Sequence, residues 1–268
     1  MAMKKTVVAA ALIALGAMAG TAEAAKCGNT SAGFVAWKSA FAAEAKANGV
    51  GAKGISALMG TSYANATIKA DRNQKSFKLS LKEFLAKRGA AGIAAKGRSL
   101  MKSNAALFAK IEKRFGVPPG PLLAIWGMET GFGGFTGNQN TISAVATLAY
   151  DCRRTAFFEE QLYAALAMIE RGTLSTTSKG AMHGEVGMTQ FLPKNIKLFG
   201  ADGDGDGRIN LNTKADALAS TAKFLKGHGW SAGNGYQPGE GNFGAIQGWN
   251  AAGVYQKAIA IIGKQIDG

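Results

Sequence analysis

Apolar residues recur at helical spacing along almost the whole chain, and this periodicity limits the possible folds more than any other feature. Phe34, Val35, Trp37 and Phe41, for example, would lie near one face of a helix. No segment longer than about four residues alternates between apolar and polar side chains, as a half-buried strand would. We therefore predict a mainly α fold with a minor strand component (α+β), including one long helix over 92–116.

The first 24 residues have the pattern of a signal peptide. Lys4 and Lys5 precede an apolar run that is shorter than a membrane span, and Ala22-Glu23-Ala24 supplies a small-residue cleavage pattern. We expect cleavage after Ala24 or Ala25 and export of the mature chain to the periplasm. A lipid anchor on Cys27 is the alternative, which Lys26 disfavours because a lipid-attachment signal has a small residue there.

Residues 25–268 are long enough for one large domain or two small ones. Residues 26–115 are a possible helical subdomain, but no linker separates them from the rest of the chain. We therefore predict a single domain over 25–268 that is a monomer.

The chain is strongly basic, with a formal net charge of +14 that falls to +13 without Lys4, Lys5 and Glu23. Such a charge favours an anionic partner, either nucleic acid, an acidic membrane surface or an acidic polysaccharide. Export and the scattered positions of the basic residues argue against nucleic acid. No apolar run after the first segment is long enough to span a bilayer.

Cys27 and Cys152 are the two cysteines of the chain. An even number in an oxidising compartment favours one disulfide, and two unrelated buried thiols are the alternative. A disulfide would close a long loop and, by chain entropy, add up to about 4–5 kcal/mol to the free energy of unfolding.

The stretch LLAIWGMETGFGG, residues 122–134, ends an apolar helix with Glu129. Ile125 and Trp126 lie four and three residues earlier, so Glu129 is on the apolar face and in the last turn. Burial and the negative end of the helix dipole both disfavour the charged carboxylate, so its pKa should rise. Such a carboxyl suits general acid catalysis, whereas a structural glutamate is the alternative.

The segment AIWGMETGFGGFTGN resembles the signature of the membrane-bound lytic murein transglycosylase B family, glycoside hydrolase family 103. The resemblance extends over about 33–266. Further motifs similar to those of the family follow its order: DRNQKSF at 71–77, TLAYDCRRTAFFEEQL at 147–162, GEVGMTQFLPKN at 184–195, DGDGDGRINL at 202–211, DALASTAKFLKGHGW at 216–230 and WNAAGVYQKAI at 249–259.

This resemblance implies a lysozyme-like transglycosylase fold and cleavage of the β-1,4 bond between N-acetylmuramic acid and N-acetylglucosamine in peptidoglycan. A single carboxylate, here Glu129, would protonate the glycosidic oxygen. It would then act as base on the C6 hydroxyl, which closes on C1 to give a 1,6-anhydro end, with assistance from the N-acetyl group. No cofactor is implied for catalysis, and peptidoglycan glycan strands are the expected partner.

Ordinary glycosidases use two carboxylates, and no second acid is obviously paired with Glu129 in the sequence. Glu185, in HGEVGM, is the nearest candidate, but its glycine-rich loop equally suits a structural or site-wall role. A lysozyme-type hydrolase and a non-catalytic peptidoglycan-binding scaffold are the alternatives to a transglycosylase.

The resemblance also assigns substrate-binding residues. Gln190 matches a family glutamine that lines the cleft, with a loop-stabilising role as the alternative. Trp249, Asn250 and Tyr255 match an aromatic–Asn–x4–Tyr pattern that would orient the sugar and its N-acetyl group. The family commonly has Tyr at the position of Trp249, so we expect a phenolic contact to be lost and stacking or core packing to remain. Ala181 stands where some members have a serine.

The stretch DGDGDGRINLNTKAD, from Asp202, resembles an EF-hand calcium loop, with Gly207 at the turn position. Thr213 occupies the position of the usual bidentate glutamate, but the family is known for a last ligand further along. We predict a structural calcium ion, with an unoccupied Asp–Gly turn as the alternative. Its ligands would come from Asp202, Asp204, Asp206, the Arg208 carbonyl and Asp216.

Overall fold

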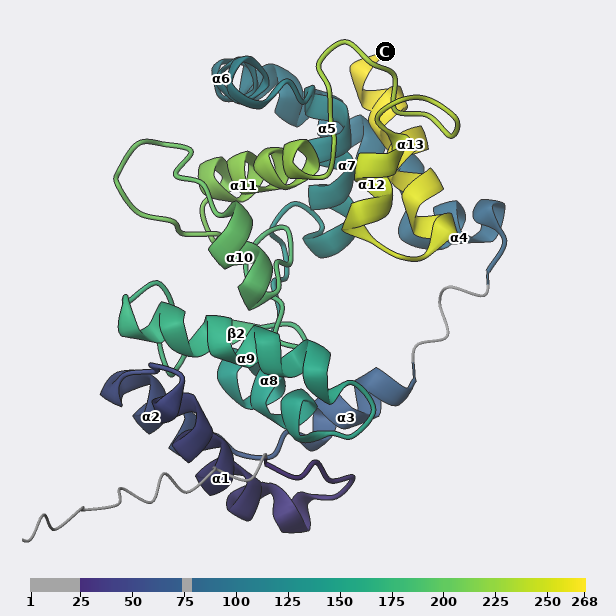
Figure 1. Ribbon diagram of the computed structural model, residues 1–268. Helices are drawn as coiled ribbons and strands as arrows, with labels where there is room; N and C mark the ends of the chain where they lie inside the picture. The colour runs from purple at the N-terminus through teal and green to yellow at the C-terminus, as the bar shows by residue number, and fades with distance from the viewer. Residues whose placement is uncertain (1–24, 74–78) are drawn as a thin grey trace, which may run out of the picture.

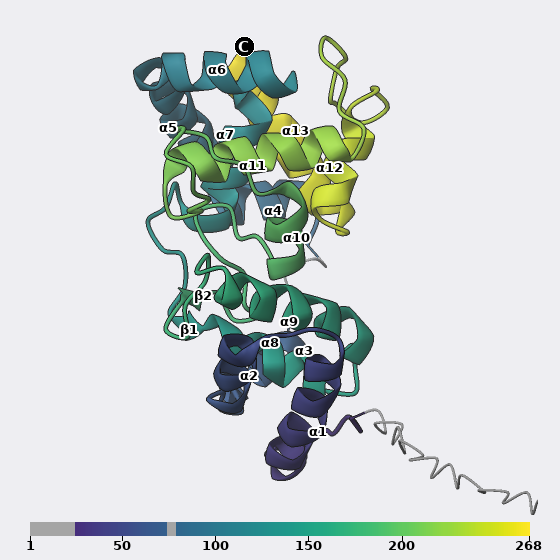
Figure 2. The same cartoon turned by 60° about the vertical axis from the view of Figure 1, so that its left-hand side comes forward.

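The computed structural model describes residues 25–73 and 79–268, and helices dominate this part of the chain (Figures 1 and 2). The predicted signal peptide over 1–24 lies outside the described residues, as does part of the motif at 71–77. Within the described ranges, every helix is too short or too polar to cross a membrane.

Two short strands, β1 (Gln139–Asn140) and β2 (Lys179–Gly180), pair antiparallel. A short 3-10 turn, Ser31–Gly33, precedes the first helix. The α-helices, in chain order, are α1 (Phe34–Ala47), α2 (Ala52–Met59), α3 (Asn65–Arg72), α4 (Leu81–Arg88), α5 (Ala90–Ser103), α6 (Ala105–Phe115), α7 (Pro119–Thr130), α8 (Thr141–Tyr150), α9 (Thr155–Glu170), α10 (Pro193–Phe199), α11 (Lys214–Gly227), α12 (Phe243–Trp249) and α13 (Gly253–Asp267).

The long helix predicted over 92–116 is wrong, because the chain breaks at Asn104 into α5 and α6. Asn104 has φ −125° and ψ 31°, and its side-chain amide donates to the Leu100 carbonyl at 2.9 Å. An asparagine side chain competes in this way with the backbone for hydrogen bonds and favours helix ends.

The helices form a lower and an upper group, joined through α10 and the loops that flank β2 (Figure 1). The lower group contains α1–α3, α8 and α9, and its core is aromatic: Phe34 and Trp37 pack against Tyr150, and Phe41 stacks on Trp37. The upper group contains α4–α7 and α11–α13. Residues 26–115 are divided between the two groups, so a single domain over 25–268 stays the prediction.

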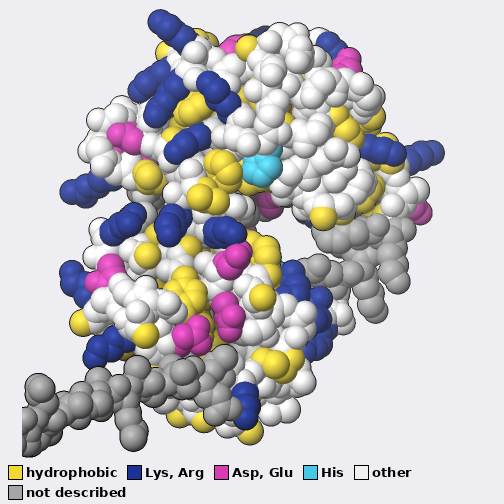
Figure 3. Space-filling view, viewed as in Figure 1, with side chains coloured by type: hydrophobic (Ala, Val, Ile, Leu, Met, Phe, Trp, Pro, Cys, Tyr) yellow, Lys and Arg dark blue, Asp and Glu magenta, His cyan; other side chains and the backbone are white. Residues whose placement is uncertain are grey.

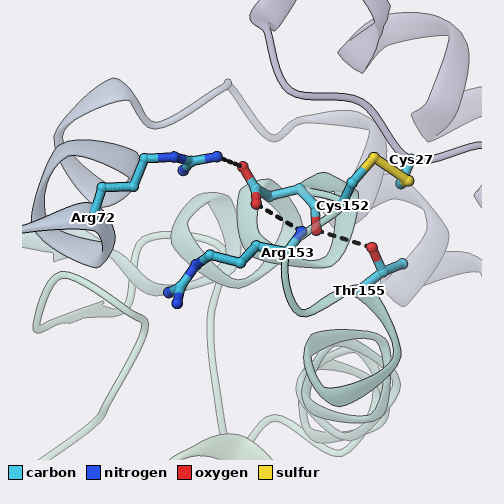
Figure 4. Close-up of a disulfide and its surroundings, with 6 residues drawn as sticks. Cys27, Arg72, Cys152, Arg153 and Thr155 are labelled. Carbon is cyan, nitrogen blue, oxygen red and sulfur yellow. Dashed lines mark hydrogen bonds and ion pairs between the residues drawn. A yellow bond between two sulfur atoms is a disulfide. The ribbon is translucent and has the colours of Figure 1, made fainter.

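A disulfide joins Cys27 to Cys152 at the end of α8, as predicted (Figure 4). The Gly28 amide donates to the Tyr150 carbonyl at 3.0 Å, next to this bond. An ion pair of 2.7 Å between Arg72 and Asp151 attaches the end of α3 at the same place. These links join three segments that are distant in the sequence: residues 27–28, the end of α3 and the residues after α8.

Helix α7 is the centre of the upper group and carries Glu129. It begins with Pro119 after the extended Pro118, where a missing N–H costs nothing. It ends at Thr130 and is capped by Gly131, whose left-handed φ of 59° glycine adopts without strain. All residues from Gly120 to Met128 are buried, whereas Glu129, near the end of the same helix, is partly exposed.

Candidate active site

The carboxylate of Glu129 is held through one of its two oxygens. Oε1 accepts a hydrogen bond from the Tyr255 hydroxyl at 2.8 Å and another from the Trp249 indole N–H at 3.1 Å. Oε2 has no hydrogen-bond partner among residues 25–73 and 79–268. Since two donors occupy the lone pairs of Oε1, a proton on this carboxyl belongs on Oε2.

Burial raises the pKa of Glu129 from its usual 4.5 to about 6, and the charge of Glu185 adds to this effect. The hydrogen bonds from Tyr255 and Trp249, together with the Arg88 guanidinium, oppose it. The rise in the pKa of Glu129 has the direction that the sequence predicted, and burial is its largest cause. The group is therefore suited to give up and take back a proton near neutral pH.

Two cavities of about 250 Å³ and 240 Å³ meet at Glu129 and Gln190, which line both. Figure 3 shows the molecule hollowed at this level, between α12 above and α8 and α9 below. The larger cavity is also lined by Glu185, Phe191, Leu192, Asn195, Phe224, Trp249 and Asn250. The smaller one is also lined by Phe135, Gly137, Asn138, Gly180, Ala181 and Met182.

Gln190 bridges the loops on the two sides of the cleft. Its side-chain amide donates to the Gly187 carbonyl at 2.8 Å and to the Thr136 carbonyl at 3.2 Å. Its backbone is left-handed, with φ 58°, as is that of Phe132, with φ 64°. Strained non-glycine backbone of this kind clusters at functional sites. Gln190 therefore stabilises the loops and also lines the cleft.

Trp249 makes a polar contact that the sequence interpretation did not include. We expected stacking or packing alone, yet its indole N–H donates to Glu129. Its ring also packs edge-on against Phe191 and Phe224, with centroid distances of 5.3 and 5.0 Å. The indole thus serves core packing and the carboxylate at once.

Tyr255 and Asn250 occupy different levels of the site. Tyr255 is 3% exposed and lies beneath Glu129, so its hydroxyl reaches the carboxylate instead of the cleft surface. Asn250 lines the larger cavity, and its Oδ1 accepts from the Ala252 amide at 2.9 Å. Tyr255 thus holds the Glu129 carboxylate from below, whereas Asn250 faces the cavity.

The sequence reasoning did not identify Arg88, at the end of α4. Its guanidinium lies 5.2 Å from the Phe84 ring centre and 5.6 Å from that of Tyr255. Its charge lowers the pKa of Glu129 and opposes the burial that raises the pKa of Tyr255. In the sequence, Arg88 is an ordinary basic residue in the last turn of a helix.

The acidic loop lies away from the cleft, between α10 and α11. One carboxylate oxygen from each of Asp202, Asp204 and Asp216 lies within 4.8 Å of the others, whereas Asp206 is outside this group and accepts from the Arg208 amide. Thr213 stands where an EF-hand loop has its bidentate glutamate. Here it caps α11 by accepting from the Asp216 amide, which explains the different residue.

Comparison with known proteins gives a family and a fold. The family model described as "Transglycosylase SLT domain" matches residues 33–240. The membrane-bound lytic murein transglycosylase B of Escherichia coli K12 is 36% identical over 134 residues, which cover 47% of this chain and 37% of that relative. The match therefore spans little more than a third of the relative's length.

Among solved structures, SltB3 of Pseudomonas aeruginosa in complex with NAG-anhNAM-pentapeptide is 27% identical, with a TM-score of 0.80 over 88% of this chain and 80% of that one. Escherichia coli Slt35 in complex with calcium is 21% identical, with a TM-score of 0.77 over 91% and 96% of the two chains. The prediction of a mainly α, lysozyme-like transglycosylase fold is confirmed. With a family match that covers most of its length, this chain belongs to the Transglycosylase SLT domain family.

Proposed function

We propose that this chain is a peptidoglycan lytic transglycosylase that cleaves the MurNAc-β-1,4-GlcNAc bond and leaves 1,6-anhydro-MurNAc ends. The observation that carries the proposal is Glu129 itself. Its carboxyl has a raised pKa, one oxygen fixed by two donors, and a second oxygen without a partner in the described residues, at the junction of two cavities.

In the first step, Glu129 Oε2 donates its proton to the glycosidic oxygen as the bond from that oxygen to C1 breaks. The acetamido oxygen of the muramic acid closes on C1 and carries the positive charge into an oxazolinium ring. The carboxylate that remains is stabilised by the hydrogen bonds from Tyr255 and Trp249, which favour the charged form.

In the second step, the same carboxylate takes the proton of the C6 hydroxyl. The C6 oxygen attacks C1, the bond between C1 and the acetamido oxygen breaks, and the 1,6-anhydro ring forms. Glu129 is again protonated, and no water is consumed. A pKa of about 6 suits both directions of proton transfer.

The two cavities support a substrate that continues on both sides of the cleaved bond. Asn250 and Gln190 are the proposed substrate contacts, since both line the larger cavity. SltB3 has been solved with NAG-anhNAM-pentapeptide and with NAG-NAM-pentapeptide, which supports the same ligand class here. Export to the periplasm is part of the proposal and is supported by the disulfide, since disulfides persist in oxidising compartments.

The basic face of the molecule supports an anionic polymer as partner. Lys and Arg side chains gather over α6, α10 and α11 in Figure 3. The basic residues of these helices include Lys110 and Lys113 on α6, Lys197 on α10 and Lys226 on α11. The peptide carboxylates of peptidoglycan provide the complementary charge.

Mass spectrometry of digested sacculi tests the proposed reaction, because an anhydro product is one water lighter than a reducing product. We expect anhydro muropeptides from the wild type and none from Glu129→Gln with its fold intact. Reducing-end products from the wild type would show a lysozyme-type hydrolase. Absence of any released muropeptide would show a non-catalytic binding protein.

We also propose that the acidic loop holds a structural calcium ion and that catalysis needs no cofactor. The donor set fits, because Asp202, Asp204 and Asp216 bring carboxylate oxygens together, and calcium prefers such ligands. Asp206 and the Arg208 carbonyl complete the proposed set. A bound cation would neutralise the mutual repulsion of these carboxylates and stabilise the loop. The calcium complex of Slt35 supports this assignment.

A further inference from the structure

A second carboxylate, that of Glu185, lines the same cavity as Glu129 but comes from the loop after β2 instead of α7. Its backbone is fixed on both sides. The Glu185 carbonyl accepts from the Ala181 amide at 2.9 Å, and Val186 and Phe191 exchange two backbone hydrogen bonds of 2.8 and 3.0 Å. Glu185 is therefore positioned as firmly as a residue in a regular element.

The preceding Gly184 adds to this rigidity. Its φ is +88°, and a Cβ there would come within 2.4 Å of Val145 Cγ2 on α8. Only glycine can hold the loop this close to the helix. The side chain of Glu185 consequently enters the cavity from a wall that rests directly on the lower group of helices.

The carboxylate of Glu185 is held by His183. The His183 backbone amide donates to Oε2 at 3.0 Å, and His183 Nδ1 lies 3.2 Å from Oε1. On the other side of the ring, Nε2 lies 3.6 Å from Asp71, which is itself paired with Arg153 and Arg154. Burial raises the pKa of Glu185, but the contacts with His183 outweigh it and hold the pKa below its usual value.

Glu129 and Glu185 therefore face one cavity with their pKa values shifted in opposite directions. Environments that separate the pKa values of two carboxyl groups assign different roles to them. Glu129 can donate a proton, whereas Glu185 stays an anion and is suited to meet positive charge. Such an anion accelerates a reaction when the positive charge forms only in the transition state.

The proposed reaction forms positive charge at one defined place. As the acetamido oxygen closes on C1, charge spreads over the acetamido group and its N–H becomes a stronger hydrogen-bond donor. We propose that Glu185 is a second catalytic residue, whose carboxylate accepts a hydrogen bond from the acetamido N–H of the muramic acid and stabilises the oxazolinium intermediate.

This inference rests on the proposed function. The proton still passes from Glu129 to the leaving oxygen, and the bond from C1 to the acetamido oxygen forms as the glycosidic bond breaks. Glu185 neither gives nor takes a proton in either step. Glu185 has two alternative roles: it could be a base that activates water, or only a structural partner of His183.

Steady-state kinetics and product analysis of Glu185→Gln test the proposal. We expect kcat to fall by about a hundredfold or more, as for loss of one electrostatic contact to a transition state, with KM within about threefold. The remaining products stay anhydro. Glu160→Gln, which removes a carboxylate paired with Lys194 on the surface, is the matched control with unchanged kinetics.

Binding of a muramic acid thiazoline, a stable mimic of the oxazolinium ring, separates a catalytic from a structural role. Its affinity should fall in Glu185→Gln by the same factor as kcat/KM, whereas binding of a disaccharide product stays unchanged. Equal loss for both ligands, or unchanged kcat, would overturn the proposal. If Glu185→Gln does not fold, Glu185→Asp is used and should lose kcat with the same loss of thiazoline binding; loss of kcat without it overturns the proposal.

Failure of this inference is distinguishable from failure of the proposed function. Anhydro products from the wild type keep the transglycosylase assignment, whatever Glu185→Gln shows. If the wild type instead forms reducing ends that Glu185→Gln abolishes, Glu185 is a base for water, and both proposals fail.

Discussion

The cleft and the acidic loop shift the pKa of a carboxyl group in opposite directions. At the end of α7, Glu129 is half-buried, and this burial raises its pKa to about 6. In the loop between α10 and α11, Asp202 is also half-buried, but it accepts hydrogen bonds from the amides of Gly205 and Gly207, which lower its pKa. One carboxyl is prepared to hold a proton and the other to remain charged.

The difference follows from which backbone groups meet the side chain. A helix C-terminus presents carbonyls, which do not stabilise an anion, whereas a glycine-rich loop can direct several N–H groups at one carboxylate. Helix and loop thus decide whether an acidic residue serves proton transfer or cation binding. Substitutions that convert one carboxylate to an amide should therefore have opposite effects on stability in the two regions.

The largest effect on stability is expected from Asp216→Asn in the loop. Asp216 is 1% exposed and accepts from the Gly203 amide at 2.8 Å and the Asn210 amide at 2.7 Å. Asparagine keeps one of these bonds and sets an NH2 group against the other, so we expect a loss of about 3 kcal/mol in the free energy of unfolding.

Thermal denaturation in a chelator measures this loss without calcium, and Tm should fall by about 6–12 °C. Asp206→Asn is the control, since Asp206 is exposed and lies outside the group of three carboxylates. An unchanged Tm in Asp216→Asn would mean that the buried carboxylate does not stabilise the loop.

Calcium should produce the next largest effect. At about one hundred times its Kd, an ion that binds only the folded chain adds about 2.7 kcal/mol to the free energy of unfolding. We expect Tm to rise with calcium, less with magnesium because of its stricter octahedral geometry, and not at all in Asp204→Asn. A calcium-independent Tm with no heat of binding in calorimetry removes the site.

These two regions also show what the sequence can predict. The position of Glu129 on a buried helix end and the order of the acidic loop depend on residues close together in the chain, and both could be read from spacing. The contacts of Trp249 and Tyr255 with Glu129 join residues 120 and 126 positions apart. No local pattern marks such a contact, and only the family resemblance pointed to these positions.

The same reason explains Arg88 and the break at Asn104. Arg88 reaches the site because α4 packs beside α13, and nothing in its own segment indicates this. The apolar spacing continues from Leu100 to Phe108 and so predicts one helix, although the side chain of Asn104 ends α5. Periodicity predicts which face is buried, but a single polar side chain can decide where a helix stops.

In the cleft, Glu129→Gln should stabilise the chain at neutral pH, opposite to Asp216→Asn in the loop. The pKa of Glu129 is raised from 4.5 to about 6. Its stabilising contribution is therefore complete below about pH 4.5 and is lost as the pH rises through about 6. Since one pKa unit corresponds to about 1.4 kcal/mol, the amide should gain about 2 kcal/mol above that range.

Chemical denaturation at about pH 4 and about pH 8 measures this linkage. The difference between variant and wild type should be near zero in the acid buffer and about 2 kcal/mol in the alkaline one. Equal stability in both buffers would mean that burial of Glu129 costs nothing, and that the contrast with the acidic loop has another cause.

The smallest effect concerns the pH dependence of the reaction. The acid form of Glu129 is required for the first step, so kcat/KM of the wild type should fall as the pH rises through about 6. The Tyr255 hydroxyl at 2.8 Å stabilises the charged carboxylate. In Tyr255→Phe the alkaline limb should therefore move up by about one pH unit, since a hydrogen bond to a charged group contributes about 1.5 kcal/mol or more.

Trp249→Phe is the matched variant, because it also removes one donor to Oε1, from the longer distance of 3.1 Å. It should shift the limb in the same direction by less. A shift in the opposite direction would contradict the role of both side chains as donors to the charged carboxylate, since the indole N–H can only donate a hydrogen bond.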